Sequence, residues 1–189
     1  QQQGGWGGQG QGGLGGLGGL GGNIGGGLGL NTNLTVGGLF SPVATQNYKI
    51  VSAVNPSFSL DASGNPLNKN QMIVYRFHGG LNQLWRFVPD GHGSFNILNA
   101  QSGGTLEIPD KSTAKQGTQC SVSQKNNTIN ESWKIVPATG VGQGKGYFIQ
   151  SVFNNLALDI EGGIVQDETR VIIWPVGNQL NQTWVIAPV

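Results

Sequence analysis

The sequence predicts an all-β domain made of three similar units, preceded by a glycine-rich arm. From Lys49 onward, short β-branched and aromatic segments are interrupted about every 8 to 12 residues by Asn, Gly, Ser and Pro. A tryptophan motif recurs three times in this region, at Trp85, Trp133 and Trp184. By contrast, 19 of the 34 glycines precede residue 40, and no Asp, Glu, Lys or Arg precedes Lys49. We therefore expect an arm over 1–40, a linker over 41–47 and one domain over 48–189.

Charge and composition exclude several classes of protein. Ten basic and nine acidic residues give a net charge of +1, which argues against nucleic acid or an anionic membrane surface as the partner. No apolar run is long enough for membrane insertion. The single cysteine, Cys120, excludes a disulfide framework and a cysteine zinc site, and no residue pattern indicates a metal or a cofactor.

The arm is a repeat with a period of three. Gly-Gly-Leu recurs from Gly12, which places Leu14, Leu17 and Leu20 three residues apart, and Gly-Gly-Trp at Trp6 has the same period upstream. This period fits the three-per-turn helix of the polyproline II family, on which the leucines would form one stripe. Such a helix leaves its backbone N–H and C=O groups free to bond neighbouring chains, which predicts a homo-oligomer or filament. The alternative is a flexible, solvated tail.

The domain divides into units over 48–90, 91–139 and 140–189. Each unit opens with an aromatic segment, at Tyr48, Phe95 and Phe148, and carries Leu-Asp or Leu-Glu near its middle, at Leu60-Asp61, Leu106-Glu107 and Leu158-Asp159. Each closes with Asn-x-x-Trp, and the tryptophans lie 48 and 51 residues apart. Since one such unit is too small to bury its own apolar face, we expect the three to share one core that contains the tryptophans.

These motifs resemble those of ricin B-type β-trefoil lectins. The similarity covers about residues 46–189 and depends on the Gln-x-Trp repeat, which is intact at Gln83-Leu84-Trp85 and Gln182-Thr183-Trp184 and altered to Glu131-Ser132-Trp133. The resemblance implies a β-trefoil, in which three hairpins cap a six-stranded barrel, with up to three shallow sugar sites.

The resemblance also implies which residues would bind sugar. Each site would combine an Asp that accepts bonds from sugar hydroxyls, a ring that stacks on the C–H face of a pyranose, and the Asn before Gln-x-Trp. The first unit offers Asp61, Tyr75 and Asn82 with Gln83, and the third offers Asp159, Trp174 and Asn181 with Gln182. The middle unit has Glu107 and Ser123 at the Asp and ring positions, so we expect no binding there. Galactose-like sugars are the expected glycans.

Each of these residues also has a purely structural interpretation. Asp61 and Asp159 could cap turns, and Tyr75 and Trp174 could be ordinary strand aromatics in a trefoil that has lost its sugar sites.

No enzyme is predicted. His78 and His92 lie beside glycines in loops, without a nucleophile at a recognisable spacing. The glycine-rich run 140–146 resembles a phosphate loop but leads into a strand, so we interpret it as a linker between units. The acidic pair Asp167 and Glu168, beside Arg170, is interpreted as a solvated loop.

Taken together, the sequence predicts a secreted, lectin-like protein that self-assembles through its arm. An extracellular location is expected because the chain starts at Gln1 without Met and has sequons at Asn33, Asn126, Asn130 and Asn181. Two alternatives remain: a structural fibre subunit whose trefoil has lost sugar binding, and a plain soluble lectin with a disordered tail.

Overall fold

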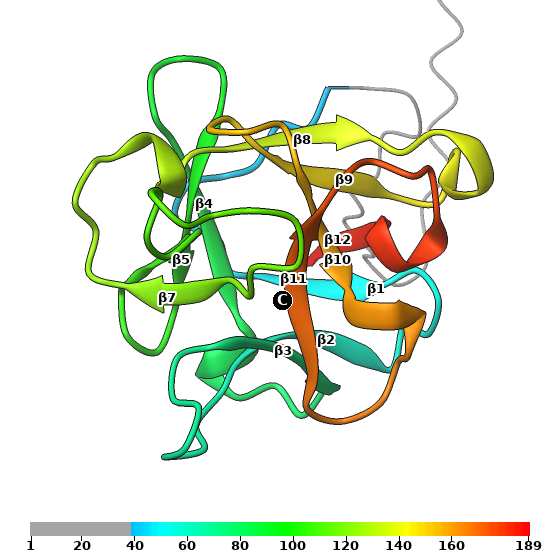
Figure 1. The fold of residues 1–189 in the computed structure, drawn as a ribbon, viewed down its shortest axis with the longest axis horizontal. Coiled ribbons are helices and arrows are strands. Elements are labelled where there is room, and N and C mark those ends of the chain that lie inside the picture. Colours follow the sequence, from blue (N-terminus) through cyan, green and yellow to red (C-terminus); the bar gives the residue numbers. More distant parts are fainter. Residues whose placement is uncertain (1–38) are drawn as a thin grey trace, which may run out of the picture. The chain divides into compact units, whose positions relative to one another are not determined.

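The computed structural model describes residues 39–189, so the predicted assembly residues Trp6, Leu14, Leu17 and Leu20 lie outside the described part of the chain. This part contains twelve strands, four in each unit (Figure 1). The first unit contains β1 (Tyr48–Ser52), β2 (Phe58–Ala62), β3 (Met72–Arg76) and β4 (Trp85–Pro89). The second contains β5 (Phe95–Asn99), β6 (Thr105–Glu107), β7 (Ser121–Ser123) and β8 (Trp133–Pro137). The third contains β9 (Tyr147–Ser151), β10 (Ala157–Ile160), β11 (Thr169–Trp174) and β12 (Trp184–Pro188).

Short 3₁₀ helices connect several of these strands. One stands immediately before the last strand of each unit: η1 (Leu81–Gln83), η2 (Ile129–Glu131) and η5 (Leu180–Gln182). Two others follow β8 and β10: η3 (Gly140–Gly142) and η4 (Glu161–Gly163). Within residues 39–189, no helix has the length and apolar character needed to cross a membrane.

Six strands form a closed barrel. The pairs β1–β12, β4–β5 and β8–β9 each share a five-residue antiparallel register. Single pairings close the ring between them, where the aromatic residue that opens each unit lies opposite its tryptophan. The remaining strands form three hairpins, β2–β3, β6–β7 and β10–β11, and β11 also pairs with β3. A six-stranded barrel with three hairpins is the predicted β-trefoil, so the fold class is confirmed.

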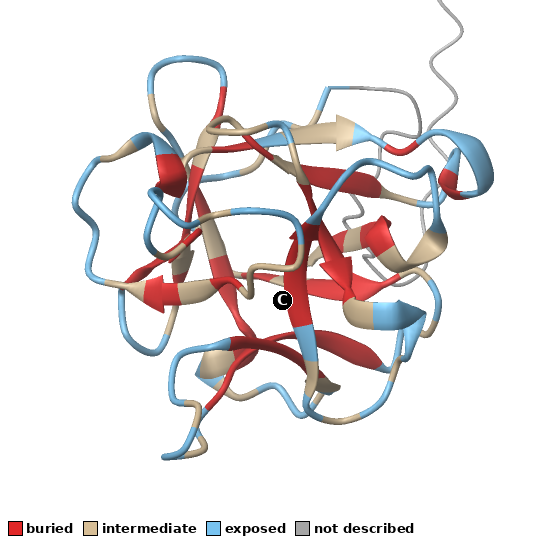
Figure 2. Cartoon of the chain, in the orientation of Figure 1, coloured by how far each residue is buried: buried red, intermediate tan, exposed pale blue. Residues whose placement is uncertain are grey.

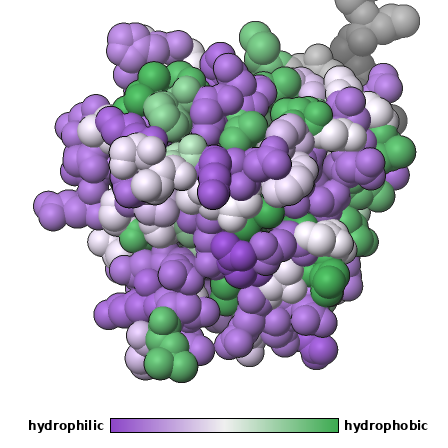
Figure 3. All heavy atoms as spheres, in the orientation of Figure 1, coloured by the Kyte–Doolittle hydropathy of each residue, from purple (hydrophilic) through white to green (hydrophobic). Residues whose placement is uncertain are grey.

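The three tryptophans lie in one shared core, as predicted. Trp85, Trp133 and Trp184 are fully buried, and buried residues follow the barrel strands throughout the domain (Figure 2). Each indole N–H donates to the carbonyl of the mid-unit leucine, with N···O distances of 3.2, 2.9 and 3.1 Å in units one to three. A buried indole N–H needs a hydrogen-bond partner. Here the partner lies on the hairpin of the same unit, so the bond connects each barrel strand to its own hairpin. On the face seen in Figure 3, hydrophilic side chains dominate and apolar ones form only small groups.

The opening residue of the third unit differs from the prediction. Tyr147 lies opposite Trp184, just as Tyr48 lies opposite Trp85 and Phe95 opposite Trp133. The third unit therefore opens at Tyr147, one residue before the predicted Phe148. Adjacent aromatic residues obscure the register in the sequence, whereas strand alternation allows only one of them to occupy the equivalent face.

Phe40, assigned to the arm by the sequence, packs against the domain. Its ring lies edge-on to the aromatic rings that open all three units, with centroid distances of 6.4 Å to Tyr48, 5.7 Å to Phe95 and 5.5 Å to Tyr147. It lies 4.9 Å from the ring of Phe87. Phe40 therefore packs as part of the folded domain and closes the end of the barrel where the three units meet.

Cys120 is buried, and burial raises the pKa of its thiol, which makes the cysteine unreactive. One other predicted feature is confirmed. The glycine-rich run 140–146 connects β8 to β9, so it is an inter-unit connection and not a phosphate loop.

Candidate functional site

The hairpin β2–β3 brings the first predicted set of residues to one face. Asp61 pairs with Ile73, and Ser59 pairs with Tyr75. Because side chains alternate along a strand, Asp61, Ile73 and Tyr75 share the face opposite to the core residue Leu60.

Two amides from the segment around η1 hold the carboxylate of Asp61. Asn82 Nδ2 and Gln83 Nε2 each donate to Oδ2 of Asp61 at 2.9 Å. Gln83 Nε2 also donates to the carbonyl of Arg76 at 2.9 Å, and its Oε1 accepts from the backbone N–H of His78 at 2.8 Å. All hydrogen-bonding atoms of the buried Gln83 amide are therefore in use, and Gln83 supports Asp61 from beneath.

Burial raises the pKa of Asp61 above its ordinary value. The hydrogen bonds from Gln83 and Asn82, together with the charge interaction with His78, oppose this shift without cancelling it. Within residues 39–189 the other oxygen, Oδ1, has no hydrogen-bond partner. This oxygen remains available to accept bonds from a ligand.

A cavity of about 380 Å³ opens over these groups. Asp61, Tyr75 and Asn82 line it, as the sequence predicts for a common site. His78 and Glu168 also line it, and neither was among the predicted site residues. His78 lies in a loop, as expected, but its Nε2 is 3.9 Å from Oδ2 of Asp61 and its ring is edge-on to Tyr75.

Glu168 reaches the first unit's cavity from the third unit. Its backbone N–H donates to the carbonyl of Val74 at 3.0 Å, and the preceding Asp167 accepts from the backbone N–H of Arg76 at 3.0 Å. The predicted solvated acidic pair therefore docks on the edge of β3. Arg170 forms its ion pair with Glu161 and not with these two residues.

The third unit repeats the arrangement around Asp159. Asn181 Nδ2 donates to Oδ1 at 2.9 Å, and Gln182 Nε2 donates to Oδ2 at 2.8 Å. Gln182 is anchored like Gln83, since its amide also bonds the carbonyl of Pro175 and the N–H of Gly177. Burial again raises the pKa of the Asp.

Trp174 has the exposure that a stacking platform needs. It lies on β11 two residues beyond Ile172, the partner of Asp159, and therefore on the same strand face. Its side chain is 41% exposed, unlike the three core tryptophans.

The equivalent residues of the middle unit form different hydrogen bonds. Glu131 accepts from the backbone N–H groups of Asn126 and Asn127 at 2.8 and 2.9 Å, instead of donating to an acidic residue as Gln83 does. Asn130 donates to the carbonyl of Ile108 at 2.8 Å and only at 3.5 Å to Glu107. A carboxylate cannot donate, so the change from Gln to Glu removes the support for the acidic group.

No metal centre is formed by the part of the chain that the structure describes. Residues 39–189 contain no group of three or more His, Cys, Asp or Glu side chains placed to hold an ion.

Comparisons with known proteins agree with this architecture. No curated protein matches the sequence. The Macrolepiota procera ricin B-like lectin in complex with lactose is 27% identical, with a TM-score of 0.66 over 78% of this chain and 99% of that chain. A designed threefold symmetric protein, ThreeFoil, is 25% identical, with a TM-score of 0.67 over 76% of this chain and 99% of that one. An exo-β-1,3-galactanase from Clostridium thermocellum is 27% identical, with a TM-score of 0.66, but the match covers 77% of this chain and only 30% of the enzyme.

A family model describes the same region. The model of the ricin-type β-trefoil lectin domain-like family matches two overlapping stretches, residues 38–123 and 81–174. The two matches together cover most of the chain. The protein therefore belongs to the ricin-type β-trefoil lectin domain-like family.

Proposed function

We propose that the protein is a secreted carbohydrate-binding protein with two sugar sites, in units one and three, which assembles through residues 1–40. The observation that carries the sugar-binding proposal is the repeated arrangement of a buried Asp, two supporting amides and an aromatic ring. Asp61 and Asp159 have it, and the middle unit, which lacks the ring, has lost it. The lactose bound by the Macrolepiota lectin supports a galactose-like ligand.

The chemistry of the first site suits a pyranose. Asp61 Oδ1 accepts from a sugar hydroxyl, the Asn82 amide both donates and accepts, and Tyr75 offers a ring to the C–H face of the sugar. His78 and Glu168 add polar groups at the rim of the cavity. In the third unit the exposed ring of Trp174 has the role of Tyr75.

Shallow sugar sites bind a surface more strongly when several of them are held together in one assembly. Linking several weak sites raises avidity by orders of magnitude without new contacts. An arm of about 30 residues in a three-per-turn extended helix would span roughly 90 Å, at ~3.1 Å per residue, far enough to reach a neighbouring copy. Assembly through the arm would thus convert two weak sites per chain into a multivalent surface.

Sugar binding is tested by probing a glycan array with the full-length protein and variants. We expect the protein to bind galactose-terminated glycans and the Asp61→Asn/Asp159→Asn double variant to lose this binding. Glu107→Gln is the matched control, since it alters the equivalent carboxyl of the unit without a ring and should leave binding unchanged. Equal binding by the double variant would exclude these sites.

Assembly is tested separately by electron microscopy. The full-length protein is compared with a variant that lacks residues 1–38, which retains Phe40 and so preserves the end of the barrel. We expect filaments or large oligomers only from the full-length chain. If both samples are monomeric, the protein is a plain lectin with a tail; if only sugar binding fails, it is a structural subunit.

A further inference from the structure

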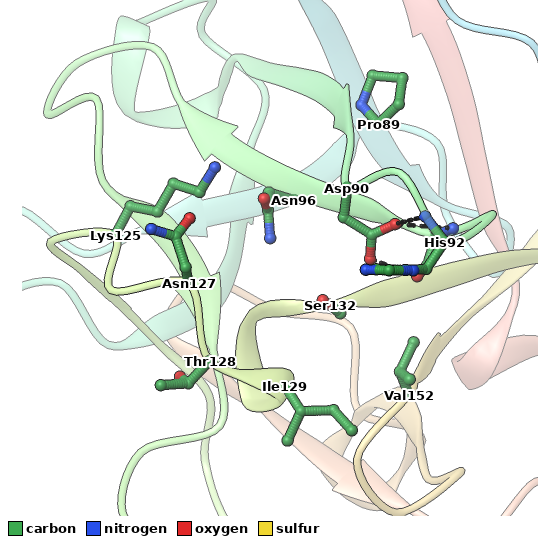
Figure 4. Close-up of a pocket in the computed structure, with 11 residues that line it drawn as sticks. Pro89, Asp90, His92, Asn96, Lys125, Asn127, Thr128, Ile129, Ser132 and Val152 are labelled. Atoms are coloured by element: carbon green, nitrogen blue, oxygen red, sulfur yellow. Dashed lines mark hydrogen bonds between the residues drawn. The ribbon is translucent and has the colours of Figure 1, made fainter.

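A second and larger cavity lies beside the junction of units one and two, and Val152 of the third unit completes its lining. It has a volume of about 550 Å³ and lies between the β4–β5 turn and the segment that leads into η2 (Figure 4). Its lining includes Asp90, His92, Asn96, Lys125, Ile129 and Val152. It shares no lining residue with the cavity over Asp61, so it is a separate site.

The β4–β5 turn gives this cavity a fixed wall. The Asp90 carboxylate accepts from the backbone N–H groups of His92 and Ser94, at 2.9 and 3.2 Å, and from the Ser94 hydroxyl. Burial would raise the pKa of Asp90, but these bonds and one from Ser132 lower it below the ordinary value. The Asp90 carboxylate is therefore stabilised by hydrogen bonds within its own turn.

The connection between β4 and β5, beside this cavity, is shorter than its counterpart between β8 and β9. At the equivalent place between units two and three, the longer β8–β9 connection folds as η3 and packs against the segment before β12. There Thr139 donates to Oδ1 of Asn178 at 2.6 Å. A Cβ on Gly140 would come within 2.5 Å of Asn178, and one on Gly142 within 2.3 Å of Thr183. The backbone of this connection therefore lies close against the segment before β12, whereas a cavity lies beside the shorter β4–β5 turn.

The open cavity is lined mainly by polar groups, with two apolar side chains along one edge. In Figure 4, Lys125 and Asn127 lie on one side, Asp90 and His92 on the opposite side, and Ile129 and Val152 along the lower edge. Asn96 is buried, and its Nδ2 donates to the carbonyl of Glu131 at 3.1 Å. Within residues 39–189 its Oδ1 accepts no hydrogen bond.

Lys125 gives the cavity a free positive charge. Its side chain is exposed, and none of the ion pairs formed among residues 39–189 includes it. A lysine ammonium donates up to three hydrogen bonds. The cavity therefore contains the ammonium group of Lys125, which forms no ion pair within the described domain, and amide and hydroxyl groups that can hydrogen-bond to a sugar. Ile129 and Val152 offer apolar surface to the C–H groups of the sugar.

We propose that this cavity binds an anionic saccharide, a sugar residue that carries a carboxylate, with Lys125 as the partner of that carboxylate. Since no Trp, Tyr or Phe lines the cavity, a neutral sugar lacks the stacking surface that Tyr75 and Trp174 offer at the other sites. The charged group is therefore the main determinant of affinity, and recognition here differs in kind from that at Asp61 and Asp159.

The test is calorimetric titration of the full-length protein with methyl β-glucuronide and with its neutral match, methyl β-glucoside. We expect the glucuronide to bind and the glucoside to bind at least about tenfold more weakly, as loss of a charge-assisted bond requires. Lys125→Gln should weaken glucuronide binding about tenfold, while Lys134→Gln, an exposed lysine on β8 outside the cavity, should have no effect. Equal affinity for the two sugars, no binding of either, or an unaffected Lys125→Gln variant would overturn the proposal.

Two further measurements separate this site from the other two. Raising the salt concentration from about 0.01 M to about 0.15 M should weaken glucuronide binding but not lactose binding, because the shorter Debye length screens the Lys125 charge. The Asp61→Asn/Asp159→Asn double variant should keep its glucuronide affinity. If it loses that affinity, the acidic sugar occupies the Asp sites and the cavity at Lys125 is not the binding site.

Discussion

The carboxylates of Asp61 and Asp159 differ in how their oxygens are used. Both amides in the first unit donate to Oδ2 of Asp61, which leaves Oδ1 without a partner in the described domain. In the third unit the amides are divided, one to each oxygen of Asp159. The two sites are therefore equivalent in sequence but not in their response to substitution.

Replacing each Asp by Asn should distinguish them. In Asp61→Asn the remaining oxygen can still accept both amides, so we expect the free energy of unfolding to change by less than about 1 kcal/mol. In Asp159→Asn the new NH₂ group faces the NH₂ group of Asn181 or Gln182 and cannot accept its hydrogen bond. This loss should lower the free energy of unfolding by about 1–3 kcal/mol. Denaturant unfolding of both variants measures the difference, and equal losses would contradict this description of the bonds.

Sugar binding should weaken in mild acid while the fold does not. Burial raises the pKa of both carboxyls, so they lose the charge that binds hydroxyls at a higher pH than the ordinary Asp value of about 3.9. A group whose pKa is raised by folding favours the folded state when protonated, and this contribution is lost as pH rises through the folded pKa. Lowering the pH therefore adds stability at these two groups.

The check is calorimetric titration with lactose between neutrality and about pH 4, beside melting curves at each pH. We expect affinity to fall toward the acid end with no matching loss of Tm. The pKa of Asp90 is lowered, so its stabilising contribution is lost only below the ordinary Asp range. An affinity that is constant over this interval would rule out ionised Asp61 and Asp159 as ligand contacts.

At the residue scale, the sequence predicted the groups that belong to the repeated motif and missed His78, which no motif marks, and Glu168, which arrives from another unit. Asp61, Tyr75 and Asn82 converge because one hairpin and the helix that follows carry them. The sequence identifies His78 only as a loop residue, because the bond from its backbone N–H to Gln83 forms only in the folded loop. Glu168 lies in the third unit, and only the pairing of β11 with β3 places it over the first unit's cavity.

Among the elements, η2 and the loop before it show how a repeat can keep its fold and change its interior. Glu131 uses both carboxylate oxygens to hold the N–H groups of Asn126 and Asn127. In Gln83 and Gln182 the side-chain oxygen accepts from one loop N–H, and the side-chain nitrogen donates to the Asp carboxylate and to a backbone carbonyl. The residue at this position thus accepts from a loop N–H in all three units, but it also donates hydrogen bonds only where it is Gln.

Restoring the Gln-x-Trp motif in the middle unit should therefore destabilise it. Glu131→Gln places an NH₂ group against the N–H of Asn127 and loses one buried acceptor, which we expect to cost about 1–3 kcal/mol. Thermal and denaturant unfolding test this. Glu161→Gln, which alters an exposed ion pair, is the control with little expected effect. An increase in stability from Glu131→Gln would show that the motif, and not its surroundings, determines the loop.

At the same scale, strand positions were predictable from alternation, but one register was not. Tyr147 and Phe148 are both aromatic, so the pattern alone does not identify which residue faces Trp184. The connection 140–146 was recognised as a linker, yet its packing as η3 depends on contacts with Asn178 and Thr183 that lie far along the chain.

The whole domain is closed at one end by a residue outside the repeats. Phe40 contacts Phe87 and the rings that open all three units, so it is a single contact shared by the entire pseudo-threefold barrel. Composition placed Phe40 in the arm because the glycine-rich stretch extends almost to it. Only the closed barrel creates the aromatic surface that it covers.

Removing this ring should weaken the domain as a unit. Phe40→Ala removes a contact shared by four aromatic rings and should lower the free energy of unfolding by about 3 kcal/mol, with one cooperative transition retained. Leu39→Ala, at a neighbouring exposed side chain, is the control with no large effect. Unfolding that is unchanged in Phe40→Ala would show that the ring does not contribute to closing the barrel.

The most direct test of the account is the stoichiometry of lactose binding, measured by calorimetric titration of the full-length protein and of Asp61→Asn. We predict two sites per chain for the unmodified protein and one for Asp61→Asn, with the fold of the variant intact by circular dichroism. Two sites in both proteins, or none in either, would contradict the assignment of sugar binding to units one and three.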